Sequence, residues 1–172
     1  MRMRNKIVTN FILLTFIEAM ICCSCSNAEQ NIPTNELPMY GGVPHTRLEQ
    51  KADLEFIDDV VKQYGTREAA LEEGLAVAWN SYYEKDYRKA MRRFNQAWLL
   101  NPNDPRVFHG FGYTLGEMGL RDEFIKWNRK SAEMGWGNAQ VSMGWAYLIG
   151  AGVEKNAKEA VRWYRMAADQ NH

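Results

Sequence analysis

The chain has 172 residues, which is the usual length of one domain. It carries 21 Lys and Arg against 21 Asp and Glu, so its formal net charge is zero. This balance excludes the strongly basic composition of a nucleic-acid-binding domain and gives no overall attraction to acidic substrates. Aromatic residues make up 12% of the chain, including 6 Trp, which indicates a packed body and not a disordered one.

Residues 1–28 have the pattern of an export signal. A basic start precedes a largely apolar stretch, residues 7–21, that is too short for a comfortable transmembrane helix. Three outcomes are consistent with this pattern. Cys25 lies in a segment that resembles a degenerate bacterial lipobox, which implies a lipid-anchored protein of the outer membrane. Ser26-Asn27-Ala28 instead resembles an ordinary signal-peptidase site, which would release the protein into the periplasm, and an uncleaved anchor is the third outcome.

Residues 29–47 predict a flexible linker, because prolines, glycines and polar side chains dominate them. Residues 37–42 are unusual for a plain spacer. An alternative is that they dock on the folded body through Met39 and Tyr40. All three cysteines precede this linker, so the body after it has no internal disulfide.

Residues 48–172 predict a body made of helices, because apolar residues recur there at helical spacing. Thr66 and Asp104 are suitable N-caps, and Pro105 suits the first position of a helix. Glycines and prolines separate the segments. The predicted helices cover residues 48–64, 66–83, 87–101, 104–119, 121–134, 138–149 and 157–168.

The helices repeat in pairs with a period of about 34 residues, the length of a two-helix repeat. Small residues stand at equivalent places in the first helices. In the second helices Ala90 and Ala97 correspond to Ala160 and Ala167, and Phe124 and Ser131 replace these small residues in the middle pair. The third pair has a connecting loop four residues longer than the other two, and Gly150 and Gly152 lie in it. The equivalent positions are Ala78, Gly112 and Gly144 in the first helices, and Phe94, Asn128 and Tyr164 in the second helices.

Residues 138–168 resemble a Sel1-like repeat, a relative of the tetratricopeptide repeat, and the two upstream pairs resemble tetratricopeptide repeats. The resemblance implies an all-α fold, a right-handed α-solenoid of helix-turn-helix repeats, and a protein or peptide partner. It is carried by Ala139, Gln140, Gly144, Tyr147, the Gly150-x-Gly152-Val153 loop, Lys158, Ala160, Trp163, Tyr164, Ala167 and Ala168.

The resemblance also implies a concave groove lined by the first helix of each pair. The residue after each small packing position faces that groove in such arrays, and its neighbours one turn away lie on the same strip. These side chains either bind a partner segment or pack as ordinary core between repeats. The predicted groove residues are Leu75, Trp79, Tyr82, His109, Tyr113, Val141 and Trp145.

The last helix has no capping helix after it, so we expect Val161, Trp163 or Met166 to be partly exposed there. A second copy of the chain or a partner would then cover this end, which makes a homodimer one of the expected assemblies. Four basic residues on one second helix, at 88, 89, 92 and 93, form either a solvated face or a site for an anionic partner such as a phospholipid headgroup.

No catalytic constellation, metal site or cofactor motif is apparent in the sequence. The three histidines are scattered at His45, His109 and His172, and no cysteine lies at metal-ligand spacing from them. The sequence therefore predicts a non-enzymatic scaffold or adaptor in the bacterial cell envelope. The alternatives are a cell-wall-associated enzyme and a purely structural assembly factor.

Overall fold

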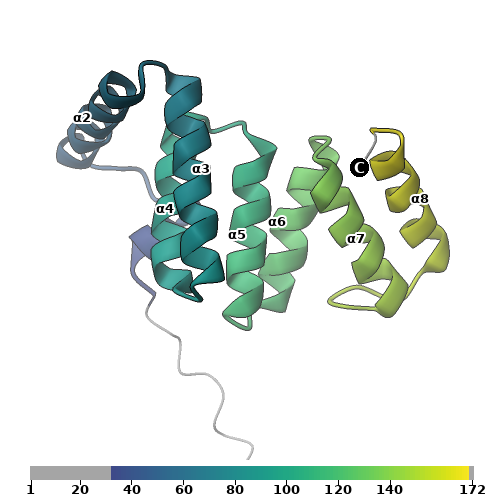
Figure 1. Ribbon diagram of the computed structural model, residues 1–172. Coiled ribbons are helices and arrows are strands. Elements are labelled where there is room, and N and C mark those ends of the chain that lie inside the picture. The colour runs from purple at the N-terminus through teal and green to yellow at the C-terminus, as the bar shows by residue number, and fades with distance from the viewer. Residues whose placement is uncertain (1–31, 171–172) are drawn as a thin grey trace, which may run out of the picture. The chain divides into compact units, whose positions relative to one another are not determined.

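The computed structural model describes residues 32–170, so the predicted signal segment, including Cys25, lies outside the described residues. The described part holds seven α-helices and no strand, which confirms the all-α fold. Figure 1 shows the helices following one another in chain order as a stack of pairs. They are α2 (Arg47–Tyr64), α3 (Arg67–Tyr83), α4 (Tyr87–Leu100), α5 (Pro105–Glu117), α6 (Arg121–Glu133), α7 (Gly137–Ile149) and α8 (Ala157–Ala168).

Side-chain caps set several helix starts where the sequence predicts them. Thr66 is the N-cap of α3, and its hydroxyl oxygen accepts a hydrogen bond from the amide of Ala69 at 3.0 Å. The carboxylate of Asp104 accepts the amide proton of Arg106 at 2.9 Å, with proline at the first position of α5. Each cap satisfies an amide group that has no partner inside its helix.

The start of α8 is capped on one side only. The side-chain oxygen of Asn156 accepts the amide protons of Lys158 and Glu159, at 3.1 and 3.2 Å. The reciprocal bond of a full capping box is absent, because the Asn156 amide instead donates to the carbonyl of Tyr147 at 2.9 Å. This bond ties the long loop back to α7.

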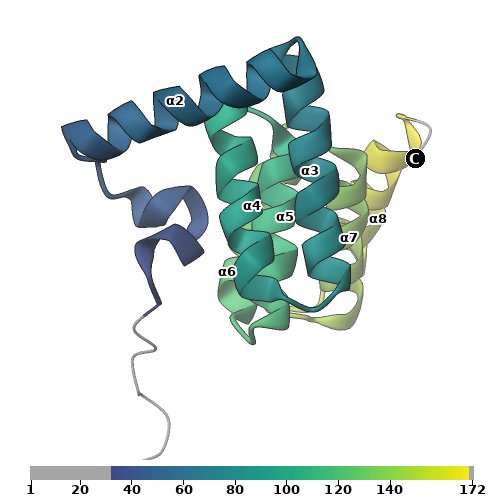
Figure 2. The same ribbon diagram turned by 60° about the vertical axis from the view of Figure 1, so that its left-hand side comes forward.

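The helices pair as α3 with α4, α5 with α6, and α7 with α8, and each pair contacts the next. Helix α2 lies across the ends of α3 and α4 (Figure 2). Ile57 and Val60 of α2 pack against the core of the first two repeats, but α2 itself buries no residue. It covers the N-terminal side of the first repeat, as expected.

The apolar interior is divided into two clusters. The larger cluster joins α3, α4 and α5, and contains Phe94, Phe108 and Phe111, which are almost fully buried. The smaller cluster joins α6, α7 and α8 around Met143 and Trp163. Helix α6 contributes residues to both clusters, so it connects the third repeat to the first two.

The N-terminal segment folds against α4, which differs from the flexible linker we expected over residues 29–47. Residues 33–43, which we call the strap, form two short 3-10 turns, η1 (Thr34–Glu36) and η2 (Pro38–Gly42). Glu36 is buried and pairs with the guanidinium groups of Arg92 and Arg88. Two cations of the predicted basic face therefore share one carboxylate within the chain.

Asn95 of α4 holds the backbone of the strap. Its side chain is fully buried, accepts the Met39 amide proton at 2.8 Å, and donates to the carbonyls of Leu37 and Asn35, at 2.8 and 3.0 Å. Met39 and Tyr40 have left-handed backbone angles, φ 51° and 55°, which cost roughly 1–2 kcal/mol for a residue with a side chain. The bonds to Asn95 offset part of that cost.

Candidate functional site

Two clefts open on the face of the helix stack that the first helices line. The inner cleft has a volume of about 540 Å³ and is lined by residues of α3, α5 and α7. The junction cleft has a volume of about 770 Å³ and lies between the α5–α6 pair and the α7–α8 pair. Tyr113, Val141 and Ser142 line both clefts, so the two clefts adjoin, and we call them together the groove.

The structure brings together all but one of the predicted groove residues. Trp79, Tyr82 and His109 line the inner cleft, Trp145 lines the junction cleft, and Tyr113 and Val141 line both. Leu75 is the exception. It is buried in the larger core cluster, one turn before Trp79 on α3, and is therefore not a groove residue.

Aromatic rings form a connected wall along the inner cleft. The ring of Trp79 lies 5.4 Å from that of Tyr82 and 6.1 Å from that of Tyr113. The same indole packs edge-on against the buried ring of Phe94, with centroids 5.2 Å apart. Trp79 therefore belongs to the groove wall and to the core at once, whereas Trp145 is 47% exposed.

His109 forms part of the inner cleft as a neutral imidazole. Asn128 donates its amide proton to the Phe124 carbonyl at 2.9 Å, which turns its oxygen toward Nδ1 of His109, 2.8 Å away. The imidazole must donate to that oxygen, so its proton lies on Nδ1. Burial lowers the pKa of His109 to about 4, against a smaller opposing effect of the Asn128 hydrogen bond.

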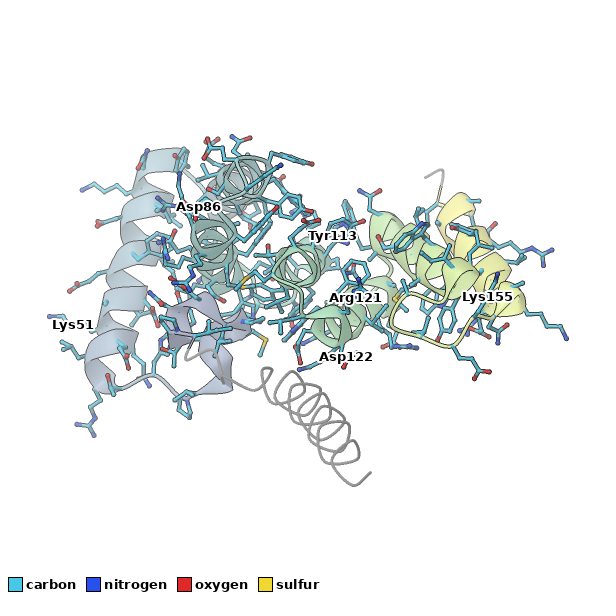
Figure 3. The ribbon with its side chains drawn as sticks, turned by 90° about the horizontal axis from the view of Figure 1, so that it is seen from below. Lys51, Asp86, Tyr113, Arg121, Asp122 and Lys155 are labelled. Atoms are coloured by element: carbon cyan, nitrogen blue, oxygen red, sulfur yellow. The ribbon has the colours of Figure 1, made fainter. Side chains whose placement is uncertain are left out.

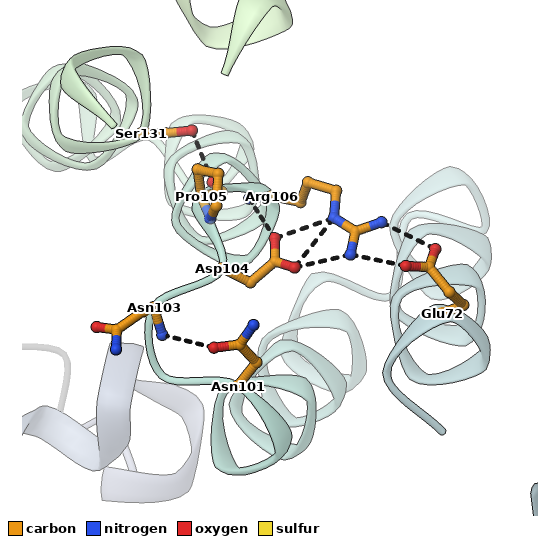
Figure 4. A network of polar contacts seen from close by, with 7 residues as sticks. All are labelled: Glu72, Asn101, Asn103, Asp104, Pro105, Arg106 and Ser131. Carbon is orange, nitrogen blue, oxygen red and sulfur yellow. Dashed lines mark hydrogen bonds and ion pairs between the residues drawn. The ribbon is translucent and has the colours of Figure 1, made fainter. Parts of the chain in front are cut away.

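Arg106 lies at the rim of the inner cleft, but its charge is already compensated. Its guanidinium donates to Asp104 at 2.7 Å and to Glu72 at 2.8 Å (Figure 4). The hydrogen bonds to Asp104 and then to Glu72 raise the pKa of Arg106 above its ordinary value. This network links α3 to the start of α5, and Ser131 of α6 donates to the Pro105 carbonyl at 2.6 Å nearby.

A hydrogen bond crosses the groove between the two clefts. The hydroxyl of Tyr113 lies 3.0 Å from Oγ of Ser142, and that hydroxyl itself donates to the Asn138 carbonyl at 2.9 Å. Tyr113 must therefore be the donor in the first bond. The bond connects α5 to α7 and forms the partition between the inner cleft and the junction cleft.

The junction cleft contains residues that the sequence analysis did not assign to the groove. Phe124 and Tyr164 add two rings to those of Tyr113 and Trp145, and Glu117 and Arg121 add one charge of each sign. The sequence pattern could have predicted Tyr164 as a lining residue, because Gly144 and Tyr164 belong to the two series of equivalent positions, in the first and second helices of the third repeat. A Cβ atom at Gly144 would lie only 2.8 Å from the Tyr164 ring.

Glu117 is held in place by two tyrosines of the first repeat. The hydroxyls of Tyr82 and Tyr87 donate to its two oxygens, at 3.4 and 3.2 Å. Burial and then the nearby carboxylate raise the pKa of both tyrosines, so they remain donors at neutral pH.

The last helix exposes less apolar surface than expected. Val161 is 48% exposed and Met166 is partly buried, but Trp163 is only 3% exposed. Trp163 cannot contact a partner at this end of the stack, because its ring packs into the smaller core cluster.

Among residues 32–170, no three His, Cys, Asp or Glu side chains gather as metal ligands would. Within the same residues, no helix combines the length and the apolar character needed to cross a membrane.

The sequence resembles those of Sel1 repeat proteins. Residues 137–172 match the sequence model of the Sel1 repeat. The crystal structure of a Sel1 repeat protein from Oxalobacter formigenes is 32% identical over 74% of this chain and 98% of that chain, with a TM-score of 0.49. No curated protein matches the sequence. The relationship rests on the repeat match and on the sequence identity over nearly the full length of that protein.

Proposed function

Because the chain belongs to the Sel1 repeat family, whose members are protein-interaction scaffolds, we propose that it binds a segment of another protein in the groove. The family fold is generally a non-enzymatic scaffold, and Sel1 repeats typically bind protein partners. The groove would act by shape and by its aromatic side chains, without turnover.

Exposed aromatic rings in two adjoining clefts are the observation that carries this proposal. Trp145 is 47% exposed in the junction cleft, Trp79 is partly exposed in the inner cleft, and Tyr113 is partly exposed and lines both. Tryptophan and tyrosine are enriched among the residues that dominate binding energy at protein interfaces. The two cleft volumes also lie in the range of ordinary binding pockets, roughly 300–1,000 Å³.

A matched pair of alanine variants tests the groove. Trp145→Ala removes an exposed groove ring, and Leu54→Ala removes a side chain that is 63% exposed on α2, away from both clefts. Both variants should stay folded. In a pull-down from envelope extract, we expect a stoichiometric partner that wild type and Leu54→Ala retain and Trp145→Ala loses. Loss with Leu54→Ala and retention with Trp145→Ala would overturn the proposal.

We also propose that the protein is exported and anchored at Cys25 by lipid, as an outer-membrane lipoprotein or, after simple cleavage, as a periplasmic protein. The basic start and the short apolar stretch support export. Intact mass of the membrane fraction, with and without Cys25→Ser, tests this. A diacyl or triacyl mass that vanishes in the variant supports lipidation, whereas an unmodified chain starting near Glu29 supports simple cleavage. An uncleaved full-length mass would overturn both.

Pairing of two copies through α8 stays a prediction. Exposed Val161 is the residue that would take part. Analytical ultracentrifugation at high protein concentration tests it, and a strict monomer would contradict it.

A further inference from the structure

The rings of the junction cleft lack the cations that other rings of this protein have. Cation–π pairs within the described residues involve Phe108, Trp127, Tyr147 and Trp163, none of which lines the cleft. The rings that do line it have no such pair. The cleft rings are Tyr113, Phe124, Trp145 and Tyr164.

The same cleft holds two charged side chains without ion-pair partners. Within residues 32–170, neither Glu117 nor Arg121 forms an ion pair, although other charged residues near the groove, such as Arg106, do. The tyrosine hydroxyls use only part of the hydrogen-bonding capacity of Glu117, since a carboxylate has about four acceptor sites. A cation can therefore still bind to it.

The two charged residues stand at the two ends of the turn that joins α5 to α6. Glu117 is bonded to Tyr82 and Tyr87 of the first repeat. The Arg121 carbonyl lies 3.6 Å from where a Cβ atom of Gly152, in the loop of the third repeat, would stand. Figure 3 shows Tyr113 and Arg121 on the side of α5 and α6 that faces the third repeat. A segment that enters the junction cleft thus meets one negative charge, one positive charge and four aromatic rings.

We infer that the bound segment carries a basic side chain for Glu117 and an acidic side chain for Arg121, on either side of a large apolar residue that fills the junction cleft. This inference rests on the proposed groove function and adds the chemistry of the partner. The aromatic faces favour the basic side chain further, because its stem and its charge both interact well with rings. The order of the two charges fixes the direction in which the segment lies.

Three fluorescent heptapeptides test this chemistry against the full-length chain by fluorescence anisotropy. Each has a central tryptophan. The first has lysine three residues before it and aspartate three residues after, the second has these reversed, and the third has glutamine and asparagine instead. We expect one charged order to bind at least about tenfold more tightly than the neutral peptide, and the other order to bind less tightly than the first.

Charge-reversal variants identify the residues responsible. In the double variant Glu117→Lys/Arg121→Glu, the preferred peptide order should switch, while Asp122→Arg, an exposed acidic residue outside the cleft, should keep the wild-type preference. Glu117→Gln removes the charge and keeps the size of the side chain and one of its two acceptor oxygens, so it covers the case in which the reversed variant misfolds. It should lose most of the preference for the charged peptide.

The outcomes distinguish a failure of this inference from a failure of the proposed groove function on which it rests. Equal binding of all three peptides, lost with Trp145→Ala, would overturn the charge pairing and leave the groove function standing. No binding of any peptide would overturn both. A charge preference that survives in the double variant would show that other residues supply it, and would also overturn the inference.

Discussion

The first two repeats and the third repeat use equivalent positions for different purposes. Phe94, Asn128 and Tyr164 stand at the same place in their second helices. Phe94 is fully buried in the core, where a Cβ atom at Gly110 would lie only 2.2 Å from its ring. Asn128 is fully buried and orients His109. Tyr164 is only partly buried and lines the junction cleft.

This comparison shows how one helix-pair unit supplies both a core and a binding surface. Between the first and second repeats, phenylalanine rings fill the space that small residues leave, and the cleft that α3 and α5 line is the smaller one, about 540 Å³. Between the second and third repeats, the core is smaller and a cleft of about 770 Å³ stays open. Stability should therefore concentrate in the first two repeats, and adaptability in the third.

The largest expected effect comes from removing the ring that closes the first junction. Phe94→Ala should lower the free energy of unfolding by roughly 3–5 kcal/mol, because it leaves a cavity in a fully buried site. Urea denaturation followed by circular dichroism measures this. The matched variant Trp145→Ala removes a ring that is 47% exposed and should cost much less. Equal losses would break the comparison.

Acid should weaken the second repeat through His109. Its pKa falls from 6.5 to about 4 on folding, so the unfolded chain binds more protons between those values. Stability from this group is complete above pH 6.5 and is lost as the pH falls toward 4, by up to about 3 kcal/mol. The position equivalent to His109 in the third repeat is Val141, which does not titrate.

His109→Gln isolates this effect from other acid-sensitive groups. The difference in unfolding free energy between wild type and variant should change steadily between pH 6.5 and pH 4 and stay constant above that range. Urea titrations at several pH values give the difference. If the difference in unfolding free energy does not depend on pH, the conclusion that His109 is a buried neutral imidazole is wrong.

Adding a methyl group at equivalent glycines should give unequal costs. A Cβ atom at Gly112 would lie 2.3 Å from the side-chain nitrogen of Asn128 and 3.2 Å from its backbone nitrogen, which cannot yield. Gly112→Ala should cost about 1–3 kcal/mol. At Gly144 the obstacle is the ring of Tyr164, which can move into the cleft, and alanine also favours the helix by up to about 1 kcal/mol.

Urea midpoints of the two glycine variants make this comparison directly. The urea midpoint of Gly144→Ala should be close to that of the wild type, and the midpoint of Gly112→Ala should be clearly lower. The reverse order would mean that the third repeat is the more tightly packed one.

The smallest effect is expected at the partition between the clefts. Tyr113→Phe removes the hydroxyl that bonds Ser142 at 3.0 Å and keeps the ring. The free energy of unfolding should therefore fall by about 1 kcal/mol. Hydrogen exchange should become faster in α7 and α8 and stay unchanged in α3 and α4. Uniform acceleration across all helices would indicate that the third repeat does not open separately.

The helices were predictable from the sequence because their signals are local. Thr66, Asp104 and Asn156 cap helices where their side-chain chemistry predicts it, and the repeat period places the first and second helices. All but one of the groove residues predicted from the resemblance to tetratricopeptide-like arrays line the two clefts. Leu75 does not, because whether a residue on that strip lies in the core or in the groove depends on how neighbouring helices pack around it.

Docking of residues 37–42 through Met39 and Tyr40 was the alternative that the sequence left open, but the contacts that hold the strap and the junction cleft could not be predicted in this way. Glu36 and Arg92 are 56 residues apart, and the strap has the proline, glycine and polar content of a linker. No pattern in the sequence distinguishes Glu117 and Arg121 from other charged residues at the surface. Their shared place in the cleft depends on the spacing of two helix pairs, which local patterns do not encode.

The strap also determines how mechanical load would enter this protein. Because Asn95 and Arg92 hold residues 35–39 on α4, the chain between the strap and α4 forms a closed loop that includes α2 and α3. A pull on the residues before Pro33 therefore reaches α4 directly through those bonds. Helix α2, which buries no residue of its own, carries no tension until the strap has peeled away.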